Sequence, residues 1–241
     1  MEVVVFSVNH FIWLGIIGLL IAAALVVIKK TQVSHSAIGR GAMIVLILLK
    51  LLHLSLSMKE SEFGGYVIDQ TQLSFHLCSI MIYFVIFSNI IKNKKVVATM
   101  KSFMVPCLFI GAAMALIIPT EGVDPAVPRV WQYMLIHGVL VFYGIYLAAV
   151  ERVDLSFRTY LNNLKLLSCV ALVAFFMNSV LEQYNTNFLF LRVPPMENLP
   201  LLNLNNGWYV YFLTLTCVAC ILMLLVQLPF MLWGKREKRK I

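Results

Sequence analysis

Long apolar stretches alternate with short polar connections along this chain of 241 residues. Seven of the stretches have about 18 residues or more, the length that a helix needs to cross a hydrocarbon core about 30 Å thick. We predict one transmembrane helix from each stretch, at residues 11–28, 41–58, 71–91, 96–118, 130–150, 164–181 and 207–233. The pattern therefore predicts an all-α fold, a polytopic membrane bundle of seven transmembrane helices.

Composition supports a membrane protein and excludes a water-soluble fold. Hydrophobic residues make up 61% of the chain and charged residues only 12%, whereas soluble domains carry about 25% charged residues. The formal net charge is +8, but the basic residues cluster beside the apolar stretches, where membrane topology explains them. We therefore expect no nucleic acid partner.

The distribution of lysine and arginine predicts the orientation of the bundle. An N-terminus outside the cell places fifteen of these residues on the cytoplasmic side and only Lys59, Arg129 and Arg192 on the outer side. The remaining cation, Lys50, lies within the second predicted span. We therefore expect the N-terminus outside, the C-terminus in the cytoplasm, a transmembrane domain over residues 1–234 and a basic cytoplasmic tail over 235–241.

Polar and ionisable residues within the spans gather in their outer halves, while the cytoplasmic halves carry little that is comparable. Such residues are costly in a bilayer, so each is a candidate for function. We expect the layer to line one cavity that opens outward beneath the loops at 119–129 and 182–206, which are rich in Pro, Asn and Gly. The layer consists of Lys50, His53, His76, Cys78, His137 and Asn178.

Helix geometry decides which members of the layer can meet. Cys78 and His137 lie at similar depths, about 10 Å inside their helices, so we expect them to face each other. On a regular helix His76 and Cys78 lie about 200° apart, so one of them is expected to serve a different role. The residues alone leave two interpretations open, a catalytic site and a structural polar network.

Three motifs occur in the order found in a known family. The segment His76-Leu77-Cys78 resembles the HLC motif of the YwaF-type seven-helix membrane proteins. Gln132, after an aromatic residue and before His137, resembles the family's aromatic-Gln...His segment. The run around Asn187 resembles an Asn-Tyr-Met-aromatic-Leu loop, with Phe at 188 where the family usually has Tyr. The resemblance covers most of the chain from about residue 50 onward.

The resemblance implies an acyltransferase, because the family includes a eukaryotic membrane enzyme that remodels phospholipids. It implies that Cys78 is a nucleophile, for which His137 is the best-placed base and His76 an orienting or oxyanion-binding group. It also implies a phospholipid or lysophospholipid partner and a bacterial cytoplasmic membrane as the location. We expect no metal and no cofactor. The expected substrate-binding residues are Lys50, His53, Gln132, Asn178 and Asn187.

Two alternatives come from other classes of protein. His53, His76, Cys78 and His137 carry zinc-competent ligand atoms, which would suit a metal-dependent intramembrane lipid hydrolase. The spans offer no Asp or Glu as its general base. The second alternative is a non-catalytic transporter or lipid-binding protein that uses the polar layer only as a binding site. It predicts that serine can replace Cys78 without loss.

Overall fold

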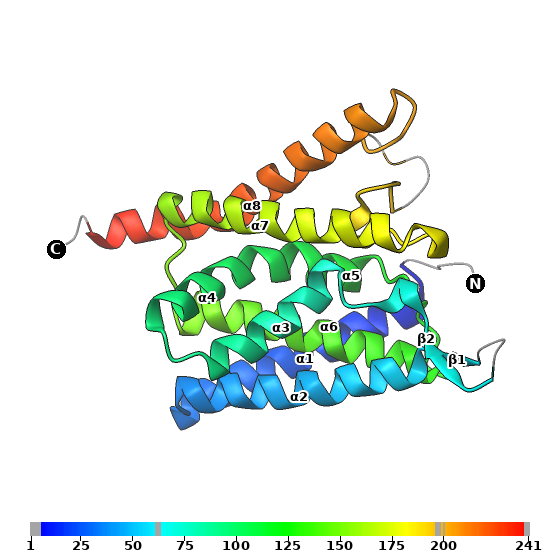
Figure 1. Cartoon of the computed structure of the whole chain (residues 1–241). Helices are drawn as coiled ribbons and strands as arrows, with labels where there is room; N and C mark the ends of the chain where they lie inside the picture. Colours follow the sequence, from blue (N-terminus) through cyan, green and yellow to red (C-terminus); the bar gives the residue numbers. More distant parts are fainter. Residues whose placement is uncertain (1–5, 61–63, 196–198, 200, 239–241) are drawn as a thin grey trace.

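The computed structural model describes residues 6–60, 64–195, 199 and 201–238, except the side chains of 233–238, and it forms a helical bundle (Figure 1). Two helices continue through π-helical turns: α4 through η2 (Phe109–Ala113) into α5 (Met114–Ile117), and α6 into η3 (Tyr146–Val150). The predicted all-α class is confirmed. The main helices are α1 (Val8–Thr31), α2 (His35–Leu56), α3 (Leu77–Ile90), α4 (Lys94–Leu108), α6 (Pro128–Ile145), α7 (Phe157–Val180) and α8 (Trp208–Lys238).

Short polar side chains explain where four of these helices begin. Ser7, Ser34, Asn93 and Ser156 stand immediately before α1, α2, α4 and α7, and each accepts a hydrogen bond from a backbone N–H of the first turn. Such N-caps satisfy donors that have no partner within the helix. Polar residues between the apolar stretches therefore fix the helix starts to within a residue.

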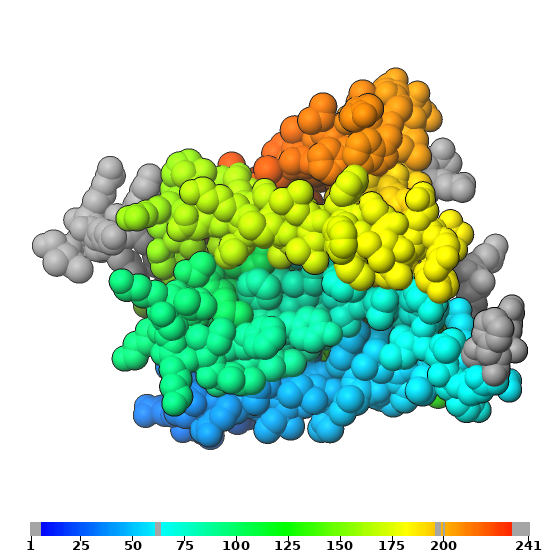
Figure 2. Space-filling model, viewed as in Figure 1, coloured from blue at the N-terminus to red at the C-terminus, as the bar shows by residue number. Residues whose placement is uncertain are grey.

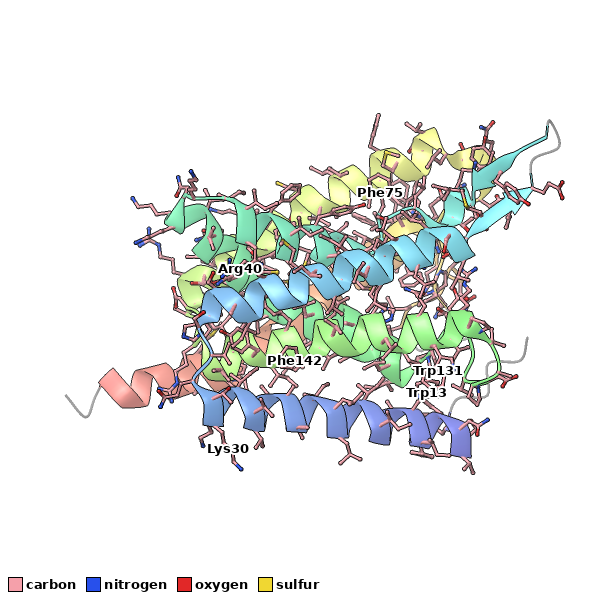
Figure 3. The ribbon with its side chains drawn as sticks, turned by 90° about the horizontal axis from the view of Figure 1, so that it is seen from below. Trp13, Lys30, Arg40, Phe75, Trp131 and Phe142 are labelled. Atoms are coloured by element: carbon pink, nitrogen blue, oxygen red, sulfur yellow. The ribbon has the colours of Figure 1, made fainter. Side chains whose placement is uncertain are left out.

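Successive main helices run in opposite directions, so the connections alternate between the two ends of the bundle (Figure 1). One end carries a small antiparallel hairpin of β1 (Met58–Glu60) and β2 (Tyr66–Ile68), and we call it the hairpin end. Trp13 and Trp131 lie toward that end, whereas Lys30 and Arg40 lie at the opposite one, which we call the basic end (Figure 3). α1 begins at the hairpin end and α8 ends at the basic end.

Six helical segments among the described residues are long and apolar enough to cross a membrane. They are α1, α2, α4 with α5, α6 with η3, α7, and α8 as far as Leu232. The seventh, α3, has only 14 residues and is therefore about 21 Å long against a hydrocarbon core of about 30 Å. The structure thus contains seven main helices, of which six meet the length of a complete span.

The third predicted span, 71–91, is wrong at its start, because residues 71–76 lie outside α3. A 3-10 turn, η1 (Gln70–Gln72), occupies part of this segment, and the Asp69 carboxylate accepts hydrogen bonds from the backbone N–H and the hydroxyl of Thr71. Side chains of this kind offer the backbone local partners that compete with helix formation. The hydropathy of the run did not reveal this polar start.

Asp69 also ties the segment before α3 to the hairpin. Its carboxylate lies 2.5 Å from the Lys59 ammonium. Burial alone would raise the pKa of Asp69, but the Lys59 ammonium and the two Thr71 donors outweigh it and hold that pKa below its ordinary value. The folded hairpin end therefore stabilises the ionised form of the Asp69 carboxyl group.

The centre of the bundle is formed by α6 and by α4 with α5. About 61% and 50% of the residues in their membrane-spanning windows are buried, against 11% for both α1 and α8. In the space-filling view the first half of α8 rises away from α7 at the hairpin end (Figure 2). The peripheral helices therefore expose most of their apolar surface, as a bundle embedded in lipid does.

Proline accounts for a hydrogen bond between α4 and α7. Pro106 has no N–H, so the carbonyl of Ser102, four residues earlier, loses the partner that a regular helix supplies. The Asn163 side chain of α7 donates to that carbonyl over 3.2 Å. Three residues after the proline the helix passes into the π-helical η2. The packing of α7 thus stabilises an irregular stretch of the central helix.

Candidate functional site

Three elements bring ionisable residues together on the hairpin-end side of the bundle. Lys50 of α2 is close enough to interact electrostatically with Cys78 in α3, with His76 just before α3 and with His53 on its own helix. The side chain of Lys50 is only 9% exposed, and no acidic residue in the described part of the chain pairs with it. A buried ammonium without a counter-ion is costly and marks a place where negative charge is stabilised.

Cys78 is the second residue of α3, so it lies in the first turn of that helix. The backbone N–H groups of Cys78 and Ser79 belong to this turn and act electrostatically on its sulfur. N–H groups of a first turn have no partner within the helix and carry the positive end of its dipole. Together with the Lys50 ammonium they form a setting that stabilises negative charge on the sulfur or on an atom bonded to it.

The π-helical η2 packs directly against this first turn. A Cβ atom placed on Gly111 would lie 3.6 Å from the backbone nitrogen of Cys78 and 3.5 Å from the side chain of Leu77. The absence of a side chain at Gly111 therefore leaves the space next to the Cys78 backbone open. π-Helical turns within α-helices are frequent at functional sites.

His137 of α6 is 7% exposed, and one of its ring nitrogens is fixed. Its Nδ1 lies 2.7 Å from the backbone carbonyl oxygen of Tyr133. A carbonyl oxygen only accepts hydrogen bonds, so the neutral ring carries its proton on Nδ1 and a lone pair on Nε2. This tautomer is the one that can take a proton at Nε2.

Tyr133 connects His137 with Cys78. Its ring centroid lies 4.3 Å from that of His137, and its hydroxyl donates to the carbonyl of Ala115 over 3.0 Å. The hydroxyl also interacts electrostatically with Cys78. Among the described residues no hydrogen bond joins Cys78 directly to His137, so the structure places the two around Tyr133 rather than in contact.

His53 and Gln132 bridge α2 and α6. The Nδ1 atom of His53 lies 3.4 Å from Oε1 of Gln132, and Nε2 of Gln132 donates to the carbonyl of Leu49 over 3.4 Å. His53 also interacts with the backbone of Gln72, in the segment before α3. This pair therefore links the two helices that carry Lys50 and His137, next to that segment.

His76 lies against the loop that follows α7. Its ring packs edge-on to Phe188 at a centroid distance of 5.4 Å and beside Phe190 at 5.8 Å. Asn178 fixes that loop with two hydrogen bonds, one to the carbonyl of Phe188 at 3.0 Å and one from its N–H at 2.7 Å. Asn187 binds the backbone of residues 192 and 193. These asparagines orient the loop, and their expected contact with substrate stays a prediction.

Sequence reasoning missed Tyr133, Gly111 and Phe188 as neighbours of the site. Tyr133 precedes His137 by four residues, a spacing that places both on one helix face and is a signal in the sequence. Gly111 follows Pro106 by five residues in a central helix, which indicates an irregular turn. The contact of Phe188 with His76 joins distant segments, and only the structure reveals it.

The proposed zinc ligands do not converge. In the part of the chain that the structure describes, no three His, Cys, Asp or Glu side chains are grouped closely enough to hold a metal ion. His137 uses Nδ1 for the Tyr133 carbonyl, and His76 packs between aromatic rings. The expected set of His53, His76, Cys78 and His137 is therefore not arranged as a metal site.

The fold defines a multi-pass α-helical membrane protein with a polar site among its helices. The chain belongs to the TMEM164 family, whose family model matches residues 5–227. The match covers nearly the whole chain, and the relation to the YwaF-type proteins stays a prediction. Searches of the curated proteins and of the solved structures found no match.

Proposed function

We propose that this protein is a membrane-embedded acyltransferase that moves an acyl chain from a phospholipid ester to a second lipid through Cys78. The observation that carries the proposal is the setting of the Cys78 sulfur. Positive charge acts on it from two sources, the first-turn N–H groups of α3 and the buried Lys50 ammonium, which has no acidic partner among the described residues. A thiol there serves as a nucleophile once a base takes its proton.

The first step forms a thioester. The Cys78 sulfur attacks the carbonyl carbon of the donor ester while the thiol proton passes to Nε2 of His137, directly or through one water molecule beside Tyr133. The carbon–oxygen bond to the glycerol breaks, and the departing oxygen takes the proton back from His137. Lys50 and the first-turn N–H groups stabilise the negative charge that develops on the carbonyl oxygen.

The second step releases the acyl chain. The hydroxyl of a lysophospholipid attacks the thioester carbonyl and gives its proton to His137, the carbon–sulfur bond breaks, and the proton returns to the Cys78 sulfur. His53, Gln132 and the loop against His76 shape the space in which the two lipids bind in turn. No metal or cofactor is required for this sequence of steps.

The shortness of α3 supports access of lipid esters to Cys78. Non-helical backbone at membrane depth is tolerated only where protein buries it or where it lines a polar cavity. Residues 73–76, between η1 and α3, are non-helical. Ester groups lie close to the hydrocarbon boundary, and we propose that α3 begins at that level. We propose that this hairpin end faces outward, as the distribution of lysine and arginine predicts.

A covalent adduct tests the proposal. The purified full chain is incubated with phospholipid, and its cysteine-containing peptides are examined by mass spectrometry for an acyl group that hydroxylamine removes. We expect the adduct on Cys78 and none on Cys107, which is 1% exposed in the neighbouring α4. Cys107→Ala is the matched control and should retain activity, whereas Cys78→Ala should lose it.

Two further variants distinguish catalysis from lipid binding. His137→Gln should lower the rate by about 10²–10⁴-fold if the imidazole acts as general base, with thermal unfolding confirming that the variant is folded. Lys50→Met should lower adduct formation while lipid binding is retained. A folded Cys78→Ala variant with full transferase activity would contradict the mechanism and leave the lipid-binding protein as the function.

A further inference from the structure

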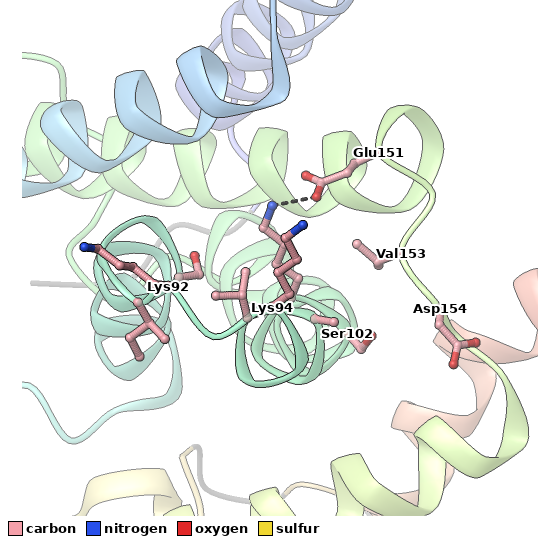
Figure 4. Close-up of a pocket in the computed structure, with 11 residues that line it drawn as sticks. Lys92, Lys94, Ser102, Glu151, Val153 and Asp154 are labelled. Carbon is pink, nitrogen blue, oxygen red and sulfur yellow. Dashed lines mark hydrogen bonds and ion pairs between the residues drawn. The ribbon is translucent and has the colours of Figure 1, made fainter.

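A cavity of about 400 Å³ opens at the basic end, far from Cys78 (Figure 4). The turn between α3 and α4 forms one wall, and the connection between α6 and α7 forms another. Its volume falls within the range of about 300–1,000 Å³ that is typical of ligand pockets. The polar residues that line it are Ser88, Lys92, Lys94, Lys101, Ser102, Glu151 and Asp154.

The acidic groups in this pocket already have partners. The Glu151 carboxylate lies 2.5 Å from the Lys101 ammonium, and both side chains are largely buried. The Asp154 carboxylate accepts hydrogen bonds from the backbone and hydroxyl of Ser156 and from the hydroxyl of Thr159, which tie it to the start of α7. Both carboxylates therefore have partners, although Oε2 of Glu151 is buried without a hydrogen bond.

Two lysines in the pocket remain without an acidic partner. No described residue forms an ion pair with Lys92 or Lys94, although both line the cavity. The side chain of Ser102 is 4% exposed and faces the same space. The pocket thus offers two free ammonium groups and a hydroxyl group, a donor set that suits a phosphate group.

Two contacts join elements near the pocket. His35 of α2 hydrogen-bonds Tyr146 of η3. The Lys101–Glu151 ion pair joins α4 to the residue after η3, and both of its residues line the pocket.

We propose that this pocket binds a phosphate-bearing anion, supplied as the headgroup of an acidic phospholipid or as free phosphate. The proposal is independent of the chemistry at Cys78, which lies toward the hairpin end. A pocket at one end of a membrane bundle meets the lipid headgroups, and basic pockets between transmembrane helices recognise anionic headgroups by this chemistry.

The experiment uses the full chain purified in a neutral detergent. Phosphatidylglycerol, phosphatidylcholine of the same acyl chains, or inorganic phosphate is added, and binding is followed by the rise in the temperature of unfolding. The test variant is Lys92→Gln/Lys94→Gln. The matched control is Lys29→Gln/Lys30→Gln, which removes the same charge from the last turn of α1 at the same end of the bundle.

We expect phosphatidylglycerol to bind and the Lys92→Gln/Lys94→Gln variant to bind it about 30-fold more weakly, the combined weight of two lysines beside an anionic headgroup. The Lys29→Gln/Lys30→Gln control should bind as the unmodified protein does. Competition by inorganic phosphate would identify free phosphate as a ligand, and its absence would identify the lipid headgroup. Equal weakening in both double variants, or equal binding of phosphatidylcholine, would overturn the proposal.

Discussion

Replacing Asn163 with leucine removes the side chain that satisfies the backbone of α4 beside Pro106. The Ser102 carbonyl then loses the bond that Asn163 donates over 3.2 Å. Asn163 is 0% exposed and Ser102 only 4% exposed. Without the amide, the buried carbonyl loses its partner in the protein.

The magnitude has two parts of opposite sign. Hydrogen bonds between transmembrane helices contribute about 0.6–1.7 kcal/mol, and a buried polar group left unpaired costs about 1–3 kcal/mol. Against this, the Oδ1 atom of Asn163 is itself buried without a hydrogen bond, so removing it recovers part of the cost. The single substitution is therefore expected to be destabilising by about 1 kcal/mol, too little to assign by itself.

A double-mutant cycle with Pro106→Ala isolates the part that belongs to the carbonyl. Alanine at 106 has the N–H that the Ser102 carbonyl lacks, so Asn163→Leu should cost about 1 kcal/mol less in that background. The effect of Oδ1 is the same in both backgrounds and cancels. The free energy of unfolding would be measured for all four proteins in mixed micelles. Asn162→Leu is the control, because Asn162 is the exposed neighbour of Asn163. A coupling energy within about 0.3 kcal/mol of zero would refute the reasoning.

Two further predictions concern other parts of the bundle. A Cβ atom on Gly39 of α2 would lie 2.4 Å from Oδ1 of Asn89 in α3, so Gly39→Ala should lower the free energy of unfolding by about 1–3 kcal/mol. Gly41→Ala has open space around it and should not, because alanine favours a helix over glycine; an equal loss in both would contradict the clash with Asn89. At the hairpin end, the folded state holds the pKa of Asp69 below its value in the unfolded chain. The ion pair with Lys59 therefore contributes its full stability above the pKa of the unfolded state. This stability is lost as the pH falls through the lower pKa of the folded state. Lys59→Met should therefore lower the unfolding temperature slightly at pH 7 and not at pH 2, whereas a loss that is the same at both pH values would contradict the ion pair.

Hydropathy predicted the helices because burial in lipid acts on every residue of a span alike. The starts predicted at 11, 41, 96 and 164 were two to seven residues too late. The local signals that mark the observed starts are the N-caps Ser7, Ser34, Asn93 and Ser156. The start of α3 was placed too early, although six of the eight residues at 69–76 are polar. The hydrogen bonds that hold the turn at Asp69 become visible only in the structure.

The sequence singled out candidate residues for the site, but it did not predict the contacts that these residues make. The cost of burying ionisable groups singled out Lys50, Cys78 and His137, and their depths suggested that they lie near one another. The fixed tautomer of His137 and the place of Tyr133 depend on contacts between α6 and its neighbours. At the basic end, Tyr146 counts as an apolar residue in any hydropathy sum. The hydropathy pattern therefore could not predict its hydrogen bond with α2.

The unequal burial of the helices determines how many substitutions each helix tolerates. Where only 11% of a spanning window is buried, as in α1 and α8, one aliphatic residue can replace another at most positions with little consequence. In α6, where 61% of the window is buried, neighbouring side chains constrain almost every substitution. Related chains should therefore diverge fastest in their first and last helices, and their sequence similarity should be retained longest in the central helices.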